Sequence, residues 1–231
     1  MSQIIAIANQ KGGVGKTTTA VNLAASLAVA EKKTLLVDMD PQANSCSGVG
    51  VDKQKAGYTV YHALLGEVEA REAIIPTRLP HLEILPANTD LTGAEIELVS
   101  AFAREIKLKT VLDTVRDDYD YILIDCPPSL GLLTVNALTA ADAVMIPLQC
   151  EFYAMEGMSQ LMQTIRLIQR DLNKELKLFG ILLTMFDSRN NLSHQVADEI
   201  RNHFDGRVFE AVVPRNVRLS EAPSHGLPVL M

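Results

Sequence analysis

The sequence of 231 residues has no tryptophan, few aromatic side chains and only three cysteines, and acidic residues outnumber basic ones. The cysteines are widely spaced and form no C-x-x-C pair, so they indicate neither a disulfide framework nor a metal or cluster motif. Lys and Arg number 21 against 28 Asp and Glu, a net charge of −7, so any contact with nucleic acid must be a local basic patch. With no basic leader and no long unbroken apolar run, we expect neither a signal peptide nor a membrane span, and a cytoplasmic protein.

The remaining composition, 48% hydrophobic and 21% charged, is typical of a globular chain with a sizeable core. Short β-type apolar runs alternate with segments of helical period, which predicts a single α/β domain with a mostly parallel central sheet of about seven to eight strands and helices on both faces. The predicted strands are residues 4–8, 34–37, 82–85, 121–124, 143–146, 179–183 and 208–213. The predicted helices are residues 20–28, 95–115, 132–141, 155–172 and 192–204, and residues 48–80 are expected to form short helices and loops.

The strongest motif directly follows the first predicted strand. It consists of Lys11, Gly12, Gly13, Val14, Gly15, Lys16, Thr17 and Thr18. Glycines let backbone N–H groups approach an anion, and the start of the following helix adds the positive end of its dipole. We expect Lys16 to reach the terminal phosphates of a nucleotide and Thr17 to present its hydroxyl to Mg²⁺. The motif is a variant of G-x-x-x-x-G-K-[ST], because Gln10 stands where glycine is usual and Lys11 is an additional lysine.

Three aspartates follow predicted strands, at the edge of a parallel sheet where ligands bind. Asp38 and Asp40 come after the second strand and are candidates for the metal shell and for positioning the attacking water, although a capped turn is the simpler alternative. Asp125 ends an apolar strand and is the best candidate for a Mg²⁺-facing Walker B aspartate. The sequence therefore predicts Thr17, Asp38 and Asp125 as metal residues, and Lys11, Lys16 and Asp40 as catalytic residues.

Residues 11–18 resemble the deviant Walker A motif of the ParA/MinD superfamily of P-loop ATPases. Residues 38–42, 125–129, 149–157 and 214–226 resemble the chromosomal ParA/Soj branch, and the resemblance covers essentially the whole chain. It implies a P-loop NTPase-like fold, ATP and Mg²⁺ as ligands, and an ATPase with weak intrinsic activity. It also implies one domain over residues 1–231 that lacks the last C-terminal helix usual in the family.

The resemblance assigns further roles. Lys11 matches the signature lysine that reaches the partner's phosphates in an ATP-sandwich homodimer, and Gly12 lies where the two subunits approach closely. Asp40 matches the residue whose loss allows ATP binding and dimerisation without hydrolysis. Pro214 and Asn216 match contacts on the adenine side.

The resemblance further implies nonspecific binding of double-stranded DNA by the ATP dimer, through Arg189 and Arg218 with Arg215 beside them. Such contacts neutralise phosphates and depend steeply on salt. The alternative for each arginine is a solvated charge or an intramolecular ion pair. The resemblance therefore implies a nucleoid-associated ATPase that partitions a chromosome or plasmid. Its hydrolysis would be stimulated by a ParB-type centromere-binding protein.

Two other functions use the same phosphate loop. A MinD-like, membrane-associated division-site ATPase would end in a basic amphipathic helix, and the sequence has none, so no stable membrane association is expected. An iron–sulfur reductase would need cysteines around a dimer axis, whereas Cys126 and Cys150 fit packed core positions better.

Overall fold

The computed structural model describes residues 2–151 and 154–231. Residues 152 and 153, which belong to the segment 149–157 singled out above, lie outside the described residues, as does Met1. One sheet of eight strands has the order β3-β4-β2-β5-β1-β6-β7-β8, in which only the β3–β4 pair is antiparallel. The strands are β1 (Gln3–Ile7), β2 (Thr34–Asp38), β3 (Ile75–Pro76), β4 (Leu82–Leu85), β5 (Tyr121–Asp125), β6 (Ala143–Gln149), β7 (Lys177–Phe186) and β8 (Val208–Pro214).

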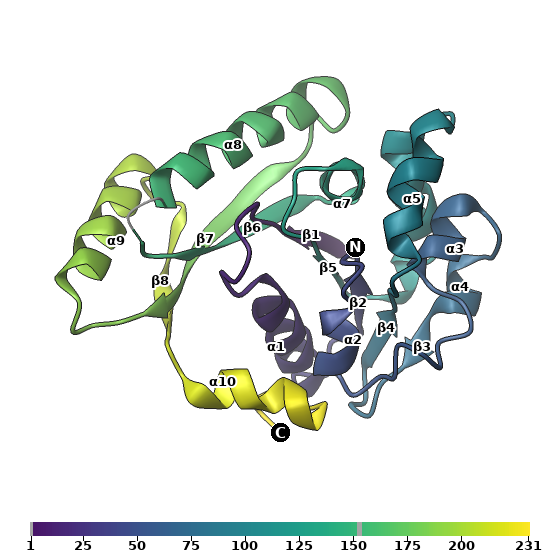
Figure 1. Ribbon diagram of the computed structural model, residues 1–231, viewed down its shortest axis with the longest axis horizontal. Coiled ribbons are helices and arrows are strands. Elements are labelled where there is room, and N and C mark those ends of the chain that lie inside the picture. The colour runs from purple at the N-terminus through teal and green to yellow at the C-terminus, as the bar shows by residue number, and fades with distance from the viewer. Residues whose placement is uncertain (1, 152–153) are drawn as a thin grey trace.

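Helices cover both faces of the sheet, with α1 on one side and α8 on the other (Figure 1). The α-helices are α1 (Lys16–Val29), α2 (Asn44–Gly48), α3 (Val60–Leu65), α4 (Ala70–Ala73), α5 (Leu91–Glu97), α6 (Lys107–Asp113), α7 (Leu132–Ala140), α8 (Ala154–Asp171), α9 (Asn191–His203) and α10 (Val217–Glu221). Short 3-10 helices span Leu98–Ser100, Arg104–Ile106, Arg116–Asp118 and Ala222–His225. In the described residues, no helix has the length and apolarity needed to cross a membrane.

The central strands are buried on both faces, which explains their continuous apolar runs. β1 lies in the middle, between β5 and β6, so the loop that follows it emerges at the centre of the sheet's carboxyl edge. The register pairs Asp38 at the end of β2 with Asp125 at the end of β5. The topology thus brings the phosphate loop and both strand-end carboxylates to one edge, as ligand sites in open parallel sheets require.

The seven predicted strands are all present, and the sequence pattern missed only the two-residue strand β3. The short helices predicted within residues 48–80 are also confirmed, as α3 and α4. In α1, Ala20, Ala24 and Ala28 are buried. Leu23 and Leu27 are only partly buried, because they border a surface groove of about 540 Å³ between α1 and the strands β7 and β8.

The prediction of one helix over residues 95–115 is wrong. The chain there forms the end of α5, two 3-10 turns and α6, with Ala103 at a φ of 53° between the turns. The buried side chain of Asn136 in α7 stabilises this break, because its Oδ1 accepts from Leu108 N at 3.1 Å and its Nδ2 donates to Arg104 O at 2.8 Å. The hydrogen bonds of Asn136, which is distant in sequence, therefore outweigh the helical periodicity that predicted one continuous helix.

Candidate nucleotide-binding site

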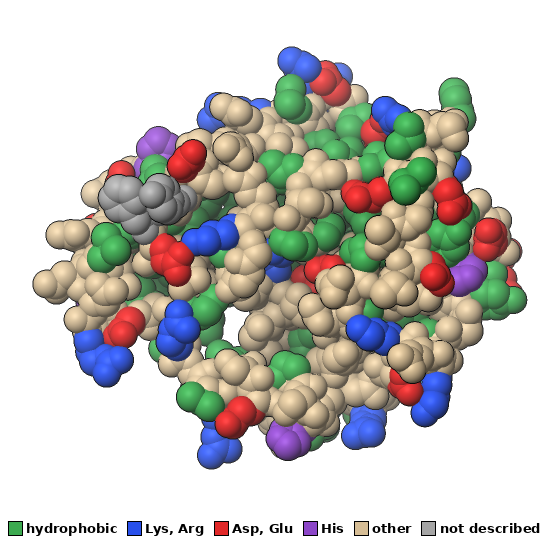
Figure 2. Space-filling view, in the orientation of Figure 1, with side chains coloured by type: hydrophobic (Ala, Val, Ile, Leu, Met, Phe, Trp, Pro, Cys, Tyr) green, Lys and Arg blue, Asp and Glu red, His purple; other side chains and the backbone are tan. Residues whose placement is uncertain are grey.

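A cavity of about 530 Å³ opens beyond the carboxyl ends of the central strands, and Figure 2 shows this face hollowed above the C-terminal segment. The predicted residues that line it are Gly12, Gly13, Gly15, Lys16, Thr17, Thr18, Asp40, Pro214, Arg215 and Asn216. Thr184 and Met185 of β7 and Asn44 of α2 complete much of the wall. The structure therefore brings the phosphate loop, one carboxylate and the C-terminal segment around a single space.

The phosphate loop has a backbone that its glycines make possible. Gly13 and Gly15 have φ angles of 73° and 88°, in the left-handed region that favours glycine. Thr184 Oγ1 donates to Val14 O at 2.8 Å, which ties the loop to β7. The loop is thus held in an open turn in front of the first turn of α1, where backbone N–H groups lack helical partners.

Lys16 lies folded over this loop. Its side chain is largely buried, the residue being 6% exposed, and Nζ donates to Lys11 O at 3.0 Å. Burial lowers the pKa of Lys16, and the negative charges of Asp125 and Asp40 oppose that shift. The ammonium group of Lys16 therefore lies at the base of the cavity. There its hydrogen bond to Lys11 O can be replaced by hydrogen bonds to phosphate oxygens.

Asp38 and Asp125 are fully buried beneath the cavity and do not line it. Burial raises the pKa of both carboxyls, and the charge of Asp38 raises that of Asp125 further. Asp38 accepts at both oxygens, from Asp40 N at 3.2 Å and from Cys46 N at 3.1 Å and Sγ at 3.3 Å. Asp125 Oδ2 accepts from Ser45 Oγ at 2.9 Å.

The second oxygen of Asp125 fits a metal shell. Oδ1 is buried and has no hydrogen-bond partner among the described residues, which is costly unless another group meets it. No group of three or more His, Cys, Asp and Glu side chains able to hold a metal occurs in the described part of the chain. Mg²⁺ typically takes one or two protein oxygens and completes its octahedron with phosphates and water. Asp125 and Thr17 fit that pattern, whereas both oxygens of Asp38 already accept hydrogen bonds.

Asp40 is the carboxylate that faces the cavity. It is 8% exposed, and its Oδ1 accepts from Gln42 N at 2.9 Å, which fixes the side chain across its own turn. A fixed carboxylate beside the phosphate loop is suited to orient a water molecule.

Lys11 does not line its own cavity. Its Nζ forms an ion pair with Glu151, just beyond the end of β6, and both side chains are partly exposed. The charge of Lys11 is therefore directed away from the base of the cavity, where the ammonium group of Lys16 lies.

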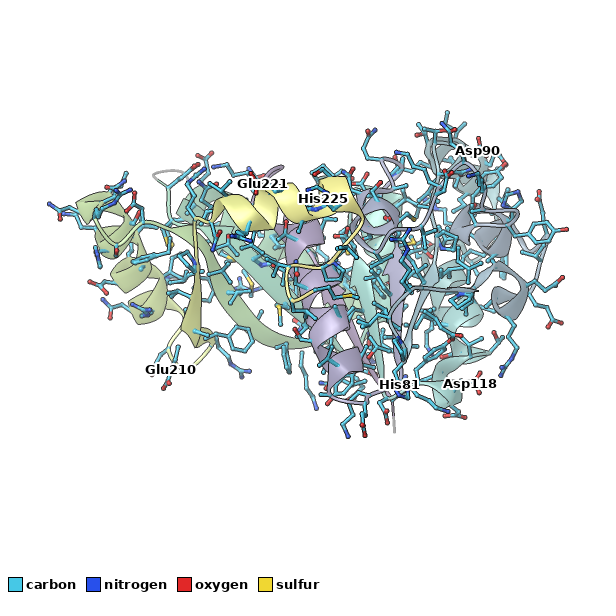
Figure 3. All side chains as sticks on the ribbon, turned by 90° about the horizontal axis from the view of Figure 1, so that it is seen from below. His81, Asp90, Asp118, Glu210, Glu221 and His225 are labelled. Carbon is cyan, nitrogen blue, oxygen red and sulfur yellow. The ribbon has the colours of Figure 1, made fainter. Side chains whose placement is uncertain are left out.

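The C-terminal segment forms the wall opposite the phosphate loop. Pro214 and Asn216 line the cavity, and Asn216 Oδ1 accepts from Arg218 N at 2.9 Å and so caps α10. Figure 3 shows this segment, with Glu221 and His225 labelled, crossing over α1. Gly226 and Gly50 pack so closely that a Cβ on Gly226 would lie 2.8 Å from Gly50 Cα, which docks the segment beside α2.

The three predicted DNA-binding arginines have different surroundings. Arg189, whose side chain is 88% exposed, forms two hydrogen bonds of 3.1 Å with Asp187, from Nε and from an Nη atom. No ion pair involves Arg215 or Arg218 in residues 2–151 and 154–231. Arg215 lines the cavity and Arg218 lies on α10. The structure thus gives Arg189 the ion pair that was the alternative to DNA contact.

Sequence reasoning missed several residues of the site. Ser45 and Cys46 hold the buried carboxylates, Thr184 supports the phosphate loop, and Glu151 binds Lys11. Two signals were available, because Ser45 and Cys46 follow Asp40 closely in the chain and Glu151 lies in the segment 149–157 that resembles the ParA/Soj branch. Thr184 lies 170 positions from Val14, and no local pattern indicates that contact.

Comparisons with known proteins agree with this geometry. The family model described as an AAA domain matches residues 2–178. Over 231 residues the chain is 59% identical to the chromosome partitioning protein ParA of Myxococcus xanthus, covering all of this chain and 82% of that protein. It is 55% identical to the sporulation initiation inhibitor protein Soj of Bacillus subtilis, covering all of this chain and 91% of Soj. The chain belongs to the ParA/Soj family of P-loop ATPases.

A solved structure with a bound nucleotide has the same fold as this chain. The structure is described as cobyrinic acid a,c-diamide synthase from Mycobacterium smegmatis with a bound ATP analog and magnesium. It superposes with a TM-score of 0.89 at 42% identity and covers 94% of this chain and 86% of that chain. As a member of the ParA/Soj family, the present chain is a nucleotide-binding ATPase of a family that binds ATP or ADP with magnesium.

Proposed function

We propose that this chain is an ATP-dependent partition ATPase that segregates a chromosome or plasmid. An ATP-sandwich homodimer binds double-stranded DNA without sequence preference. Hydrolysis, stimulated by a ParB-type partner, returns the protein to monomers that leave the DNA and the nucleoid. ATP acts as the ligand that shifts the equilibrium toward the dimer, because it has contacts there that the monomer lacks.

The placement of the two lysines of the phosphate loop carries this proposal. Lys16 lies at the base of the cavity, whereas Lys11 extends out of it toward Glu151. One phosphate loop thus supplies one cation for its own nucleotide and a second cation for another. Gly12 lies between them on the cavity wall, where a Cβ would have no neighbour closer than Pro128 Cβ at 3.9 Å.

The residues of the chain divide the chemistry of hydrolysis among them. The phosphate loop and Lys16 would bind the nucleotide's phosphates, and Asp40 would orient the attacking water. Thr17 and Asp125 would hold Mg²⁺, which supplies charge neutralisation on the transferred phosphoryl group. Lys11 of the partner subunit would complete this neutralisation, so that hydrolysis depends on the dimer.

The DNA contact rests on arginines at the open edge of the molecule. Arg218 and Arg215 have no acidic partner in the described residues, so their charges are available to phosphates. Basic and acidic side chains are interspersed around the rim in Figure 2, so on a chain of net charge −7 the DNA contact would be a small patch of a few arginines. Two-fold symmetry would double such a patch, so the dimer binds DNA more tightly than the monomer.

Binding to nonspecific duplex DNA tests the proposal. It is measured without nucleotide, with ATP–Mg²⁺ and with ADP–Mg²⁺, each at two salt concentrations. We expect salt-sensitive DNA binding only in the presence of ATP–Mg²⁺. Binding that does not depend on the nucleotide would contradict the switch.

The Asp40→Ala variant separates nucleotide binding from hydrolysis. With ATP it should dimerise and retain DNA while releasing no phosphate, and Lys11→Ala should bind ATP as a monomer. If Asp40→Ala with ATP fails to dimerise or fails to retain DNA, the proposal fails. Sedimentation of the ATP-bound protein with anionic liposomes would instead support the MinD-like alternative.

A further inference from the structure

The two buried carboxylates share a support that no motif indicated. Asp38 and Asp125 are register partners on neighbouring strands, and both are 0% exposed. No Lys or Arg forms an ion pair with either of them in the described residues. Their orientation therefore depends on hydrogen bonds, most of which come from the short helix α2.

Helix α2 contacts each carboxylate with one of two consecutive residues. Ser45 Oγ donates to Asp125 Oδ2 at 2.9 Å, and Cys46 donates to Asp38 Oδ2 from both its backbone and its thiol. Ser45 and Cys46 are themselves 0% exposed. A fully buried hydroxyl has little choice of partner, so this bond persists in the folded protein.

The Ser45 bond occupies one oxygen of Asp125 and leaves the other free. Oδ1 is buried without a partner among the described residues. A carboxylate with one oxygen fixed cannot turn about its χ2 axis without losing that bond. The bond to Ser45 therefore fixes Oδ2 and leaves Oδ1 as the oxygen without a partner among the described residues.

We propose that Ser45 is a positioning residue that aims Oδ1 of Asp125 at the Mg²⁺ of the bound nucleotide. The proposal rests only on the magnesium–nucleotide part of the proposed function, and not on dimerisation, DNA or a partner protein. Residues behind a metal ligand typically change metal affinity by 10–100-fold when they are removed. Cys46, at the next position of α2, holds Asp38 through its backbone N and its thiol.

Titration of Mg²⁺ against binding of a fluorescent, hydrolysis-resistant ATP analogue tests this role. We expect Ser45→Ala to need about tenfold more Mg²⁺ than the wild type for half-maximal tight binding. In EDTA, where no metal is bound, its affinity for the analogue should equal that of the wild type. Ser45→Cys keeps the size of the side chain with a weaker donor and should give an intermediate Mg²⁺ midpoint.

Ser47→Ala is the matched control, because Ser47 also lies in α2 and its hydroxyl makes no hydrogen bond in the described residues. Its Mg²⁺ midpoint should equal that of the wild type. The proposal is overturned if Ser45→Ala keeps the wild-type midpoint, or if its affinity falls equally with and without Mg²⁺, which would indicate general damage to the cavity. Thermal unfolding of each variant without nucleotide establishes that it is folded, and if Ser45→Ala is not, the Ser45→Cys midpoint decides alone. Because the assay needs neither dimer nor DNA, a negative result for Ser45 leaves the partition proposal intact. Likewise, a failure of dimerisation or DNA binding leaves the proposed role of Ser45 intact.

Discussion

The phosphate end of the cavity and the arginine segments differ in how their charges are held. Lys16, Asp38 and Asp125 are buried, and hydrogen bonds with neighbouring groups set the direction of each side chain. Arg189 and Arg218 are exposed, and Arg189 has only a neighbour in its own loop as a partner. A buried charge costs folding free energy unless it is paired or hydrogen-bonded, so burial requires precise geometry around it. Exposed charges are screened and act through their number and sign.

This contrast corresponds to two kinds of ligand. A nucleotide is recognised atom by atom, and an error of about 1 Å in a catalytic group can cost about a hundredfold in rate. Nonspecific DNA offers a regular line of phosphates, so flexible arginines suffice. Under the proposed function, the chain would use rigid charges for the nucleotide and adaptable charges for DNA, and the following variants test whether the division holds.

Lys16→Ala should have the largest effect. It removes the cation at the base of the cavity, and we expect a loss of about a hundredfold or more in affinity for ATP–Mg²⁺, measured by fluorescence of a labelled nucleotide. Lys32→Ala, in the exposed turn after α1, is the control and should bind as the wild type. If Lys16→Ala binds ATP–Mg²⁺ as tightly as the wild type, the buried lysine does not bind the phosphates. The contrast between buried charges for the nucleotide and exposed charges for DNA would then fail.

Arg218→Ala should come next, with about a tenfold loss of affinity for duplex DNA in the presence of ATP and a shallower salt dependence. Arg189→Ala should lose less, because Arg189 is already paired with Asp187. Asp187→Asn releases that arginine and should strengthen DNA binding. Fluorescence anisotropy at several salt concentrations checks all three, and equal losses for both arginine variants would show that the ion pair does not matter.

Asp125→Asn should stabilise the nucleotide-free protein by about 1 kcal/mol at pH 7.5. Burial raises the pKa of this carboxyl above its unfolded value, so the folded state binds more protons and the free energy of unfolding falls as the pH rises from about 4 through the raised pKa. The variant should lose that part of the pH dependence. Urea unfolding at several pH values measures it, with the exposed Asp205→Asn as control. A variant less stable than the wild type at pH 7.5 would contradict this account.

Glu151→Gln should have the smallest effect. It frees Lys11 from an exposed ion pair that contributes at most about 1 kcal/mol, so the protein concentration for half-dimerisation with ATP should fall about threefold. Glu156→Gln, an exposed site on α8, is the control. Analytical ultracentrifugation measures the midpoint. Weaker dimerisation of Glu151→Gln would show that Glu151 supports the dimer directly.

The sequence predicted the site well where function depends on local order. A strand, a glycine-rich loop and a helix follow one another in the chain, so residues 11–18 predict a phosphate site from local sequence alone. Most of these residues line the cavity. Continuous apolar runs located all seven longer strands. These features depend on neighbours in sequence, which is the information that periodicity contains.

The sequence failed where a distant residue decides the structure. The break between α5 and α6 depends on Asn136, and the aim of Asp125 depends on Ser45, 80 positions away. Lys11 and Glu151 lie 140 positions apart. A hydrogen bond across such a span leaves no periodic signal, because each partner is a single polar residue whose neighbours follow their own pattern.

The close approach of Gly50 and Gly226 has a consequence for nucleotide selection. It docks the C-terminal wall of the cavity beside α2, the helix that also contacts Asp38 and Asp125. If the base binds against Pro214 and Asn216, as the resemblance predicts, a base that fits poorly would displace this wall and, through the contact of Gly50 with Gly226, α2. A wrong nucleotide would then be penalised twice, by weaker binding and by a misdirected carboxylate, so the enzyme's preference among nucleoside triphosphates would be sharper in turnover than in affinity.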